Sequence, residues 1–206
     1  MGLTAWQALI ERGKLKPGQK VFIQAGSGGV GTFAIQLAKH LGATVATTTS
    51  TLNMDLVRSL GADVIVDYKK ENFETKLSAY DLVLHSQNGK ELEKSLHVLK
   101  AGGRLVSISG PPDPAFAKDL GAAGIFKLVV RLLSSGVRRK AKNLGIHFSF
   151  LFMKASGEQL QKIADLIDAG KIRPVIDKVF PFESTNEALA YVETGRAKGK
   201  IVIKMK

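Results

Sequence analysis

The first half of the chain alternates between short apolar runs and longer segments in which apolar residues recur at helical spacing. The runs lack the polar alternation of a half-exposed strand, and they lie at residues 21–23, 43–47, 64–66, 82–84 and 104–109. Such runs are typical of strands that are buried on both faces of a parallel sheet. Because helical segments separate them, the pattern predicts an α/β fold with a doubly wound parallel sheet (a Rossmann fold) of about six strands.

This alternation stops at Gly-Pro-Pro-Asp-Pro, residues 110–114. We interpret these prolines as excluding a regular element, and we expect a helical excursion from there to about Gly145. The sixth strand is expected over residues 147–153, from His147 to Met153. Beyond it the pattern predicts a helix, a strand, a short helix and a last strand, over residues 156–169, 174–180, 186–193 and 200–204.

A G-x-G-x-x-G motif, formed by Gly26, Gly28 and Gly31, joins the first predicted strand to the helix that follows it. In a dinucleotide site, one such glycine makes the tight turn, one lets backbone N–H groups approach a pyrophosphate, and one packs the helix against the strand. The alternative is a glycine-rich turn without a ligand. The strand before the motif and the helix after it favour a dinucleotide site.

The residues after the second predicted strand favour NADPH over NADH. Residues 47–51 are all threonine or serine, and the first carboxylate beyond them is Asp55, inside the next helix. A carboxylate here would hold the ribose 2′-hydroxyl of NADH, whereas hydroxyl groups accommodate a 2′-phosphate. The alternative is a threonine-rich strand end with one capping hydroxyl. Thr49, Ser50 or Thr51 offers an N-cap for the next helix, and basic support would come from Arg58 or from Lys69 and Lys70 beside Tyr68.

No catalytic residue is identified from the sequence. The residues four positions beyond the tyrosines are Asn72, Leu84 and Gly195, so the Tyr-x-x-x-Lys pattern of short-chain dehydrogenases is excluded. Ser86 lacks the flanking glycines of a nucleophile elbow. His85, at the carboxyl end of a predicted strand, could touch the cofactor, but a lone histidine there is more often a packing or solvated residue. Ser109 and Gly110, at the end of the fifth strand, are better placed to line a nicotinamide pocket.

Composition adds few constraints on function. The formal net charge is +12, and residues 120–157 contain basic side chains and no acidic ones. Without aromatic interleaving or a nucleic-acid motif, we interpret this window as a solvated face and expect no nucleic-acid or membrane partner. The chain has no cysteine, and its histidines lack metal-site spacing, so no metal site is expected. Residues 1–14 lack a secretory signal pattern, which leaves a cytoplasmic location as the expectation.

Several blocks of sequence, taken together and in this order, resemble the medium-chain dehydrogenase/reductase superfamily and, within it, the zinc-free NADPH quinone oxidoreductase branch. These blocks are Gly-Leu-Thr-Ala-Trp-Gln-Ala-Leu at residues 2–9, the glycine-motif segment at 25–39, Ser-Leu-Gly-Ala-Asp at 59–63 with Asp67 and Tyr68, Leu-Lys-Ala-Gly-Gly-Arg at 99–104, and Gly-Lys-Ile-Val at 199–202.

The resemblance implies hydride transfer from NADPH to a quinone or to an activated carbon–carbon double bond. It also implies that Ser27, Gly28, Gly29 and Val30 meet the pyrophosphate, and that Ser50 and Tyr68 lie near the 2′-phosphate. A homodimer through the sheet edge at residues 147–153 is a further implication. Two departures stand out: Leu52 and Asn53 replace a lysine that is frequent in relatives, and residues 85–89 replace Asp-x-x-Gly-Gly.

Relatives also carry an amino-terminal catalytic domain. We therefore expect residues 1–154 to form the NADP-binding domain, and residues 155–206 to be a returning segment of an otherwise missing catalytic domain, whose two strands would lack their usual partners and present open edges. The chain would then be a fragment whose isolated activity is low. The alternatives are an enoyl reductase module of a polyketide or fatty-acid synthase, a non-catalytic NADPH-binding protein, and a nucleic-acid binder that uses the basic window.

Overall fold

The core of the protein is a six-stranded parallel sheet with the strand order β3-β2-β1-β4-β5-β6. The structure is a computed structural model that describes residues 1–121 and 123–205. This order places the two halves of the sheet on either side of the β1–β4 boundary, as in the dinucleotide-binding fold. The predicted α/β fold is confirmed, with strands β1 (Lys20–Ile23), β2 (Thr44–Thr49), β3 (Val64–Asp67), β4 (Tyr80–His85), β5 (Leu99–Ser107) and β6 (His147–Phe150).

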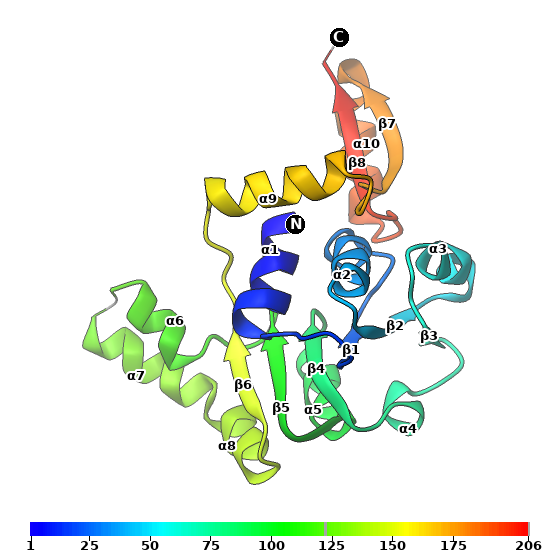
Figure 1. Cartoon of the computed structure of the whole chain (residues 1–206). Helices are drawn as coiled ribbons and strands as arrows, with labels where there is room; N and C mark the ends of the chain where they lie inside the picture. Colours follow the sequence, from blue (N-terminus) through cyan, green and yellow to red (C-terminus); the bar gives the residue numbers. More distant parts are fainter. Residues whose placement is uncertain (122, 206) are drawn as a thin grey trace.

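Helices cover both faces of the sheet, because each central strand carries apolar residues on both sides (Figure 1). In β1, Val21 and Ile23 join the core on one face, whereas Phe22 joins the core on the other. The first face is covered by α1 (Gly2–Trp6), η1 (Gln7–Arg12), α2 (Gly29–His40), α3 (Met54–Ser59) and α9 (Gly157–Asp168), and the second by α4 (Phe73–Lys76), α5 (Gly89–Val98) and α8 (Ser135–Asn143).

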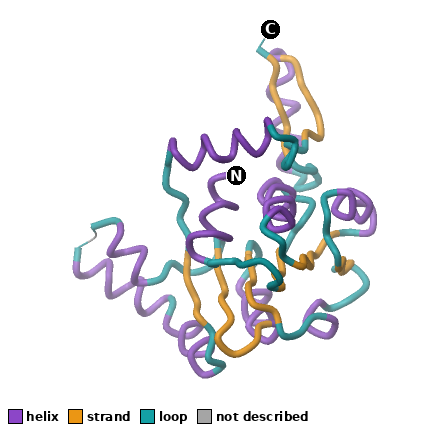
Figure 2. Tube along the Cα trace, in the orientation of Figure 1, coloured by secondary structure: helices purple, strands orange, loops and turns teal. Residues whose placement is uncertain are grey.

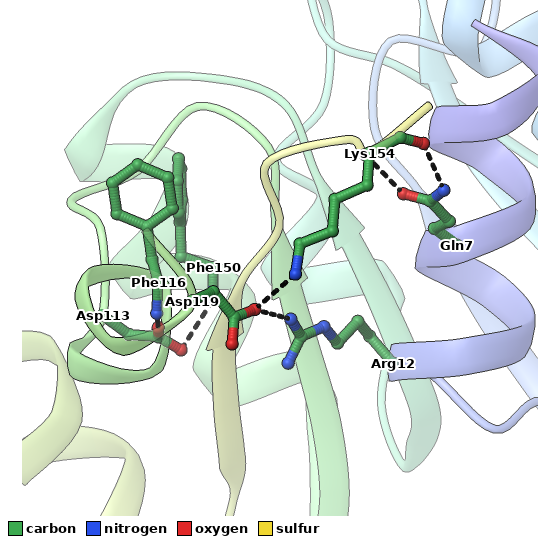
Figure 3. A network of polar contacts seen from close by, with 7 residues as sticks. All are labelled: Gln7, Arg12, Asp113, Phe116, Asp119, Phe150 and Lys154. Carbon is green, nitrogen blue, oxygen red and sulfur yellow. Dashed lines mark hydrogen bonds and ion pairs between the residues drawn. The ribbon is translucent and has the colours of Figure 1, made fainter. Parts of the chain in front are cut away.

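The proline-rich turn after β5 starts a helix, which corrects the expectation that its prolines exclude one. Helix α6 (Pro114–Asp119) begins with proline at its first position, where a helix needs no N–H donor. One carboxylate oxygen of Asp113 caps this helix by accepting from Phe116 N at 2.9 Å. Its other oxygen accepts from Phe150 N at 3.1 Å. Asp113 thereby ties the start of the excursion to β6 (Figure 3).

The end of α6 is held against the amino-terminal helical segment by exposed polar contacts (Figure 3). The carboxylate of Asp119 lies 3.4 Å from the Arg12 guanidinium and 3.1 Å from Lys154 Nζ. Gln7 in turn accepts from Lys154 N at 3.0 Å and donates to Lys154 O at 2.8 Å. The chain leaving β6 is thus fixed to η1. Helix α7 (Gly124–Leu133) and α8 continue the excursion, as the sequence predicted.

The last fifty residues return to the sheet and then form a small second sheet (Figures 1 and 2). Ile163 of α9 and Ile172 are buried in the main core. Strands β7 (Ile176–Pro181) and β8 (Lys200–Lys204) then pair in parallel with each other. Helix α10 (Thr185–Glu193) provides the crossover that a parallel pair requires. Within the described residues each strand pairs only with the other, so the outer edge of each is open, as expected. Within the described residues, no helix is long and apolar enough to cross a bilayer.

Candidate dinucleotide-binding site

The glycine motif forms a tight turn between the end of β1 and the start of α2. Gly26 N donates to Thr48 O at 2.9 Å, and Gly28 N donates to Ala25 O at 3.0 Å. Gly28 is the extended N-cap of α2, and it has no side chain to cap the helix. The first-turn N–H groups and the positive end of the helix dipole therefore lack a side-chain cap, which suits the binding of an anion.

Two glycines of the motif are required by close packing. A Cβ atom on Gly31 would lie 2.3 Å from Ala25 O and 2.7 Å from Gly26 Cα. A Cβ atom on Gly26 would lie 2.1 Å from Thr47 Oγ1. Residues 25–31 could not form this turn with a side chain at either position, since distances below 3.0 Å demand movement of the neighbour. The tight turn and the close packing expected of a G-x-G-x-x-G motif are thus present.

A cavity of about 890 Å³ lies beside this turn. Its walls come from the glycine turn, the carboxyl ends of β2 and β3, the start of α5 and residues 195–198. Of the residues singled out from the sequence, it includes Ser27, Gly28, Thr49, Ser50 and Tyr68. Its volume is within the range of pockets that hold drug-sized ligands. The lining contains four basic residues, Lys69, Lys94, Arg196 and Lys198. It also contains three acidic residues, Glu71, Glu74 and Glu91.

The other predicted residues lie outside the lining of this cavity. Gly26, Gly29, Val30 and Gly31 make the turn and the first helical turn behind it. Ser109 and Gly110 lie beyond the end of β5, in the other half of the sheet. The structure therefore brings Ser27 and Gly28 of the expected pyrophosphate residues together with Ser50 and Tyr68 at one cavity, and places the expected nicotinamide residues further along the same sheet edge.

The hydroxyls after β2 do not cap the next helix, contrary to expectation. Neither Ser50, which precedes η2 (Thr51–Asn53), nor Asn53, which precedes α3, makes a side-chain cap bond. Thr51 instead donates to Asp67, and Thr49 Oγ1 donates to Ser27 Oγ at 3.1 Å. These side chains bind across the loops instead of along their own helix, because β1, β2 and β3 end at the same edge of the sheet.

Asp67 is a carboxylate that the sequence reasoning missed at this site. Strand pairing places it beside Thr49. It is buried, and it accepts from Thr51 Oγ1 and from Lys69 N at 3.0 Å. The hydrogen bond from Thr51, with smaller contributions from Lys69 and Lys70, lowers the pKa of Asp67 below its usual value. The carboxylate is therefore charged at neutral pH and already engaged by the protein.

Ser27 and Asn53 have polar atoms that are placed for a ligand. Ser27 Oγ accepts from Thr49 Oγ1 and from Asn53 Nδ2 at 3.3 Å, which leaves its own proton to be donated elsewhere. Asn53 Oδ1 is buried and finds no hydrogen-bond partner within residues 1–121 and 123–205. Since a buried polar atom ordinarily has a partner, this oxygen indicates a missing donor.

The carboxy-terminal segment contributes residues that the sequence reasoning did not assign to the site. Gly199 N donates to Ser27 O at 2.9 Å, which holds Arg196 and Lys198 at the cavity wall. Arg58, by contrast, does not line the cavity. It pairs with Asp55 at 2.6 Å on an exposed surface, so the basic support expected from it is not found at the cavity.

Comparison with known proteins identifies similar chains. The model of the zinc-binding dehydrogenase family matches residues 60–203. Among curated proteins, the chain is 39% identical to NAD(P)H oxidoreductase RTN4IP1, mitochondrial, from Bos taurus, over 98% of this chain and 53% of that protein. It is 35% identical to the NADPH-dependent alkenal/one oxidoreductase, chloroplastic, from Arabidopsis thaliana, over 97% of this chain and 44% of that protein.

Among solved structures, the quinone oxidoreductase from Coxiella burnetii is similar in fold and sequence. It superposes with a TM-score of 0.82 and 32% identity, over 100% of this chain and 58% of that one. The chain thus spans about half the length of the curated relatives it matches. Within the described residues, no group of three or more His, Asp or Glu side chains is arranged to hold a metal ion.

Proposed function

The chain belongs to the zinc-binding dehydrogenase family of the medium-chain dehydrogenase/reductase superfamily, and from this we propose that it is the cofactor-binding part of an NADPH-dependent oxidoreductase. The reaction would be hydride transfer from the nicotinamide to a quinone or to an activated carbon–carbon double bond. The observation that carries the proposal is the glycine turn beside the 890 Å³ cavity. The names of the relatives, which include an alkenal/one oxidoreductase and a quinone oxidoreductase, support the substrate class.

The residues present fit a dinucleotide. Ser27, Gly28, Gly29 and Val30 would hold the pyrophosphate through the start of α2, and Ser50 and Tyr68 would lie at the 2′-phosphate. The orphaned Asn53 Oδ1 would accept a hydrogen bond from the adenosine ribose. The cofactor itself supplies the hydride, so the work of these residues is to bind it and to orient it.

We propose NADPH as the cofactor in preference to NADH. Lys69, Arg196 and Lys198 line the cavity and favour an additional phosphate. Asp67 would favour NADH if its carboxylate were available to the ribose, but Thr51 and Lys69 N already occupy it.

Fluorescence titration of the chain with each reduced cofactor is the test of this function. We expect NADPH to bind about tenfold more tightly than NADH, because one charge-assisted contact contributes on the order of 1.5 kcal/mol or more. The preference should shrink as salt is added, since the 2′-phosphate contacts are partly exposed. Equal affinity for both cofactors would remove the NADPH assignment, and absence of binding would remove the function.

We also propose, from the family resemblance, that the protein forms a homodimer through the sheet edge at residues 147–153. Strand β6 ends at Phe150, so the edge is shorter than expected. Leu151 N points toward β5, where it donates to Ser107 O, so the N–H groups of Phe148 and Phe150 point outward. The N–H group of Phe150 already donates to the Asp113 carboxylate. Pairing would then centre on Phe148. Sedimentation velocity should show a dimer, and a monomer at all concentrations would contradict the proposal.

We further propose that residues 1–154 form the NADP-binding domain and that residues 155–206 belong to a catalytic domain. We also propose that the protein holds no zinc, binds no nucleic acid and is cytoplasmic. The name of the Bos taurus relative places that protein in mitochondria, and the name of the Arabidopsis thaliana relative places that one in chloroplasts. The similarity therefore does not select one compartment for this chain.

A further inference from the structure

His85 is a fully buried histidine at the carboxyl end of β4, and it is not itself part of the cavity lining. Its ring lies between two loops. Nδ1 is 2.9 Å from Ser107 Oγ at the end of β5, and Nε2 is 3.2 Å from the backbone oxygen of Asn88. Asn88 is the N-cap of α5, and its side chain accepts from Lys90 N and Glu91 N. The ring therefore joins the end of β5 to the start of α5.

The partners of the ring fix its tautomer. The Asn88 carbonyl can only accept, so Nε2 carries the proton. Burial lowers the pKa of His85 to about 4, so the ring is neutral at pH 7 and Nδ1 is an acceptor. Ser107 must then donate its hydroxyl proton to Nδ1. This leaves the lone pairs of Ser107 Oγ to accept from elsewhere.

Ser107 Oγ accepts from the turn that follows β5. Gly110 N donates to it at 2.8 Å, and Ser109 N lies at 3.4 Å. The approach is so close that a Cβ atom on Gly110 would lie 2.6 Å from Ser107 Oγ. A second bridge runs in parallel, because Ser109 Oγ donates to Gln87 O at 2.6 Å. The turn at residues 109–110 is therefore shaped by a relay of hydrogen bonds that begins at Asn88.

This relay lies at the edge of the sheet where the second half of a dinucleotide binds. With the strand order observed here, a dinucleotide would cross the β1–β4 boundary at the carboxyl ends of the strands. The glycine turn and the ends of β2 and β3 place the cavity on the β1–β2–β3 side, which is the adenosine side, and Gln87, Glu91 and Lys94 extend its lining to the loop after β4 and to α5. The turn after β5 lies outside this lining and is left for the nicotinamide.

We propose that His85 is a positioning residue that acts through Ser107 to hold the turn at Ser109 and Gly110 against the nicotinamide end of the cofactor. The inference rests on the proposed function. It assigns a role to one of the two places where the sequence departs from its family resemblance, the segment at residues 85–89. A neutral imidazole is suited to this role because it offers one acceptor and one donor on opposite sides of a rigid ring.

The test compares two ligands on the chain by titration calorimetry. NADPH contains both halves of the cofactor, whereas adenosine 2′,5′-bisphosphate contains only the adenosine half. His85→Leu and Ser107→Ala remove the relay at different points, and Ser107→Ala also leaves the histidine ring in place. We expect both variants to bind NADPH about tenfold more weakly, which corresponds to loss of one or two hydrogen bonds, and to bind the bisphosphate within about twofold of the unmodified chain.

His85→Gln is the conservative variant, because glutamine also offers one acceptor and one donor. It should recover most of the NADPH affinity that His85→Leu loses. Unchanged NADPH affinity in Ser107→Ala would overturn the inference. An equal loss for both ligands would also overturn it, since that is the effect of a general structural change. If the unmodified chain binds the bisphosphate and NADPH equally well, the nicotinamide makes no contact and the inference fails while the cofactor site stands. If it binds neither ligand, the proposed function itself fails.

Discussion

Replacing Gly31 by alanine is expected to abolish NADPH binding at micromolar protein concentrations. The added Cβ atom would lie 2.3 Å from Ala25 O and 2.7 Å from Gly26 Cα, and both are backbone atoms. A flexible side chain could move aside, but here the turn itself must open. The N–H groups at the start of α2 would then no longer converge on one pyrophosphate. Fluorescence titration of the Gly31→Ala chain with NADPH measures the loss.

The substitution should also lower the free energy of unfolding by about 1–3 kcal/mol, the usual cost of overpacking. Urea unfolding measures this change in the free energy of unfolding and shows whether the variant is folded under the conditions of the titration. Gly124→Ala is the matched control, because Gly124 begins α7 and a Cβ atom there meets nothing within 4 Å. It should leave both NADPH affinity and stability within experimental error or slightly raise stability. A Gly31→Ala chain that binds NADPH with unchanged affinity would show that the turn is not the phosphate cradle.

The sheet could be predicted from the sequence because its signal is local. Val21 and Ile23 point to one face of the sheet and Phe22 points to the other, and all three are apolar. A strand needs apolar residues on both faces only when helices cover both faces of its sheet. The glycine motif is a local signal as well, because its spacing predicts the tight turn in which Gly26 and Gly31 pack closely. Pro114 shows the limit of such reasoning. The same residue that breaks the interior of a helix is favoured at its first position, and only the capping contact from Asp113 distinguishes the two cases.

The parts of the site that were missed depend on lateral or long-range contacts. A search some twenty residues past the glycine motif stops near the end of β2, whereas Asp67 reaches the same place from β3 by strand pairing with Thr49. Arg196 and Lys198 arrive from the other end of the chain, through the contact between Gly199 N and Ser27 O. No periodicity within either segment indicates that they meet.

Replacing Asn53 by lysine is expected to raise the preference for NADPH over NADH by about a further tenfold. Leu52 and Asn53 stand where the family resemblance implies a lysine, and the Asn53 side chain lies at the cavity with its Nδ2 3.3 Å from Ser27 Oγ. An ammonium group there would pair with the 2′-phosphate of NADPH, and NADH has no such group. The substitution also removes the hydrogen bond from Asn53 Nδ2 to Ser27 Oγ and the proposed ribose contact of Asn53 Oδ1, and these losses weaken the binding of both cofactors alike. Parallel titrations with NADPH and NADH give the ratio.

Asn143→Lys is the control for this experiment, since it makes the same exchange at an exposed position at the end of α8 that does not line the cavity. It adds the same charge and should leave the ratio unchanged. The gain from Asn53→Lys should also diminish with added salt, because an ammonium at the cavity rim is screened over about 10 Å at 0.1 M ionic strength. An equal gain for both cofactors would place the new charge at the pyrophosphate instead. In that case the 2′-phosphate would have to be sought nearer to Arg196 and Lys198, and the loop after β2 would position the cofactor without selecting it.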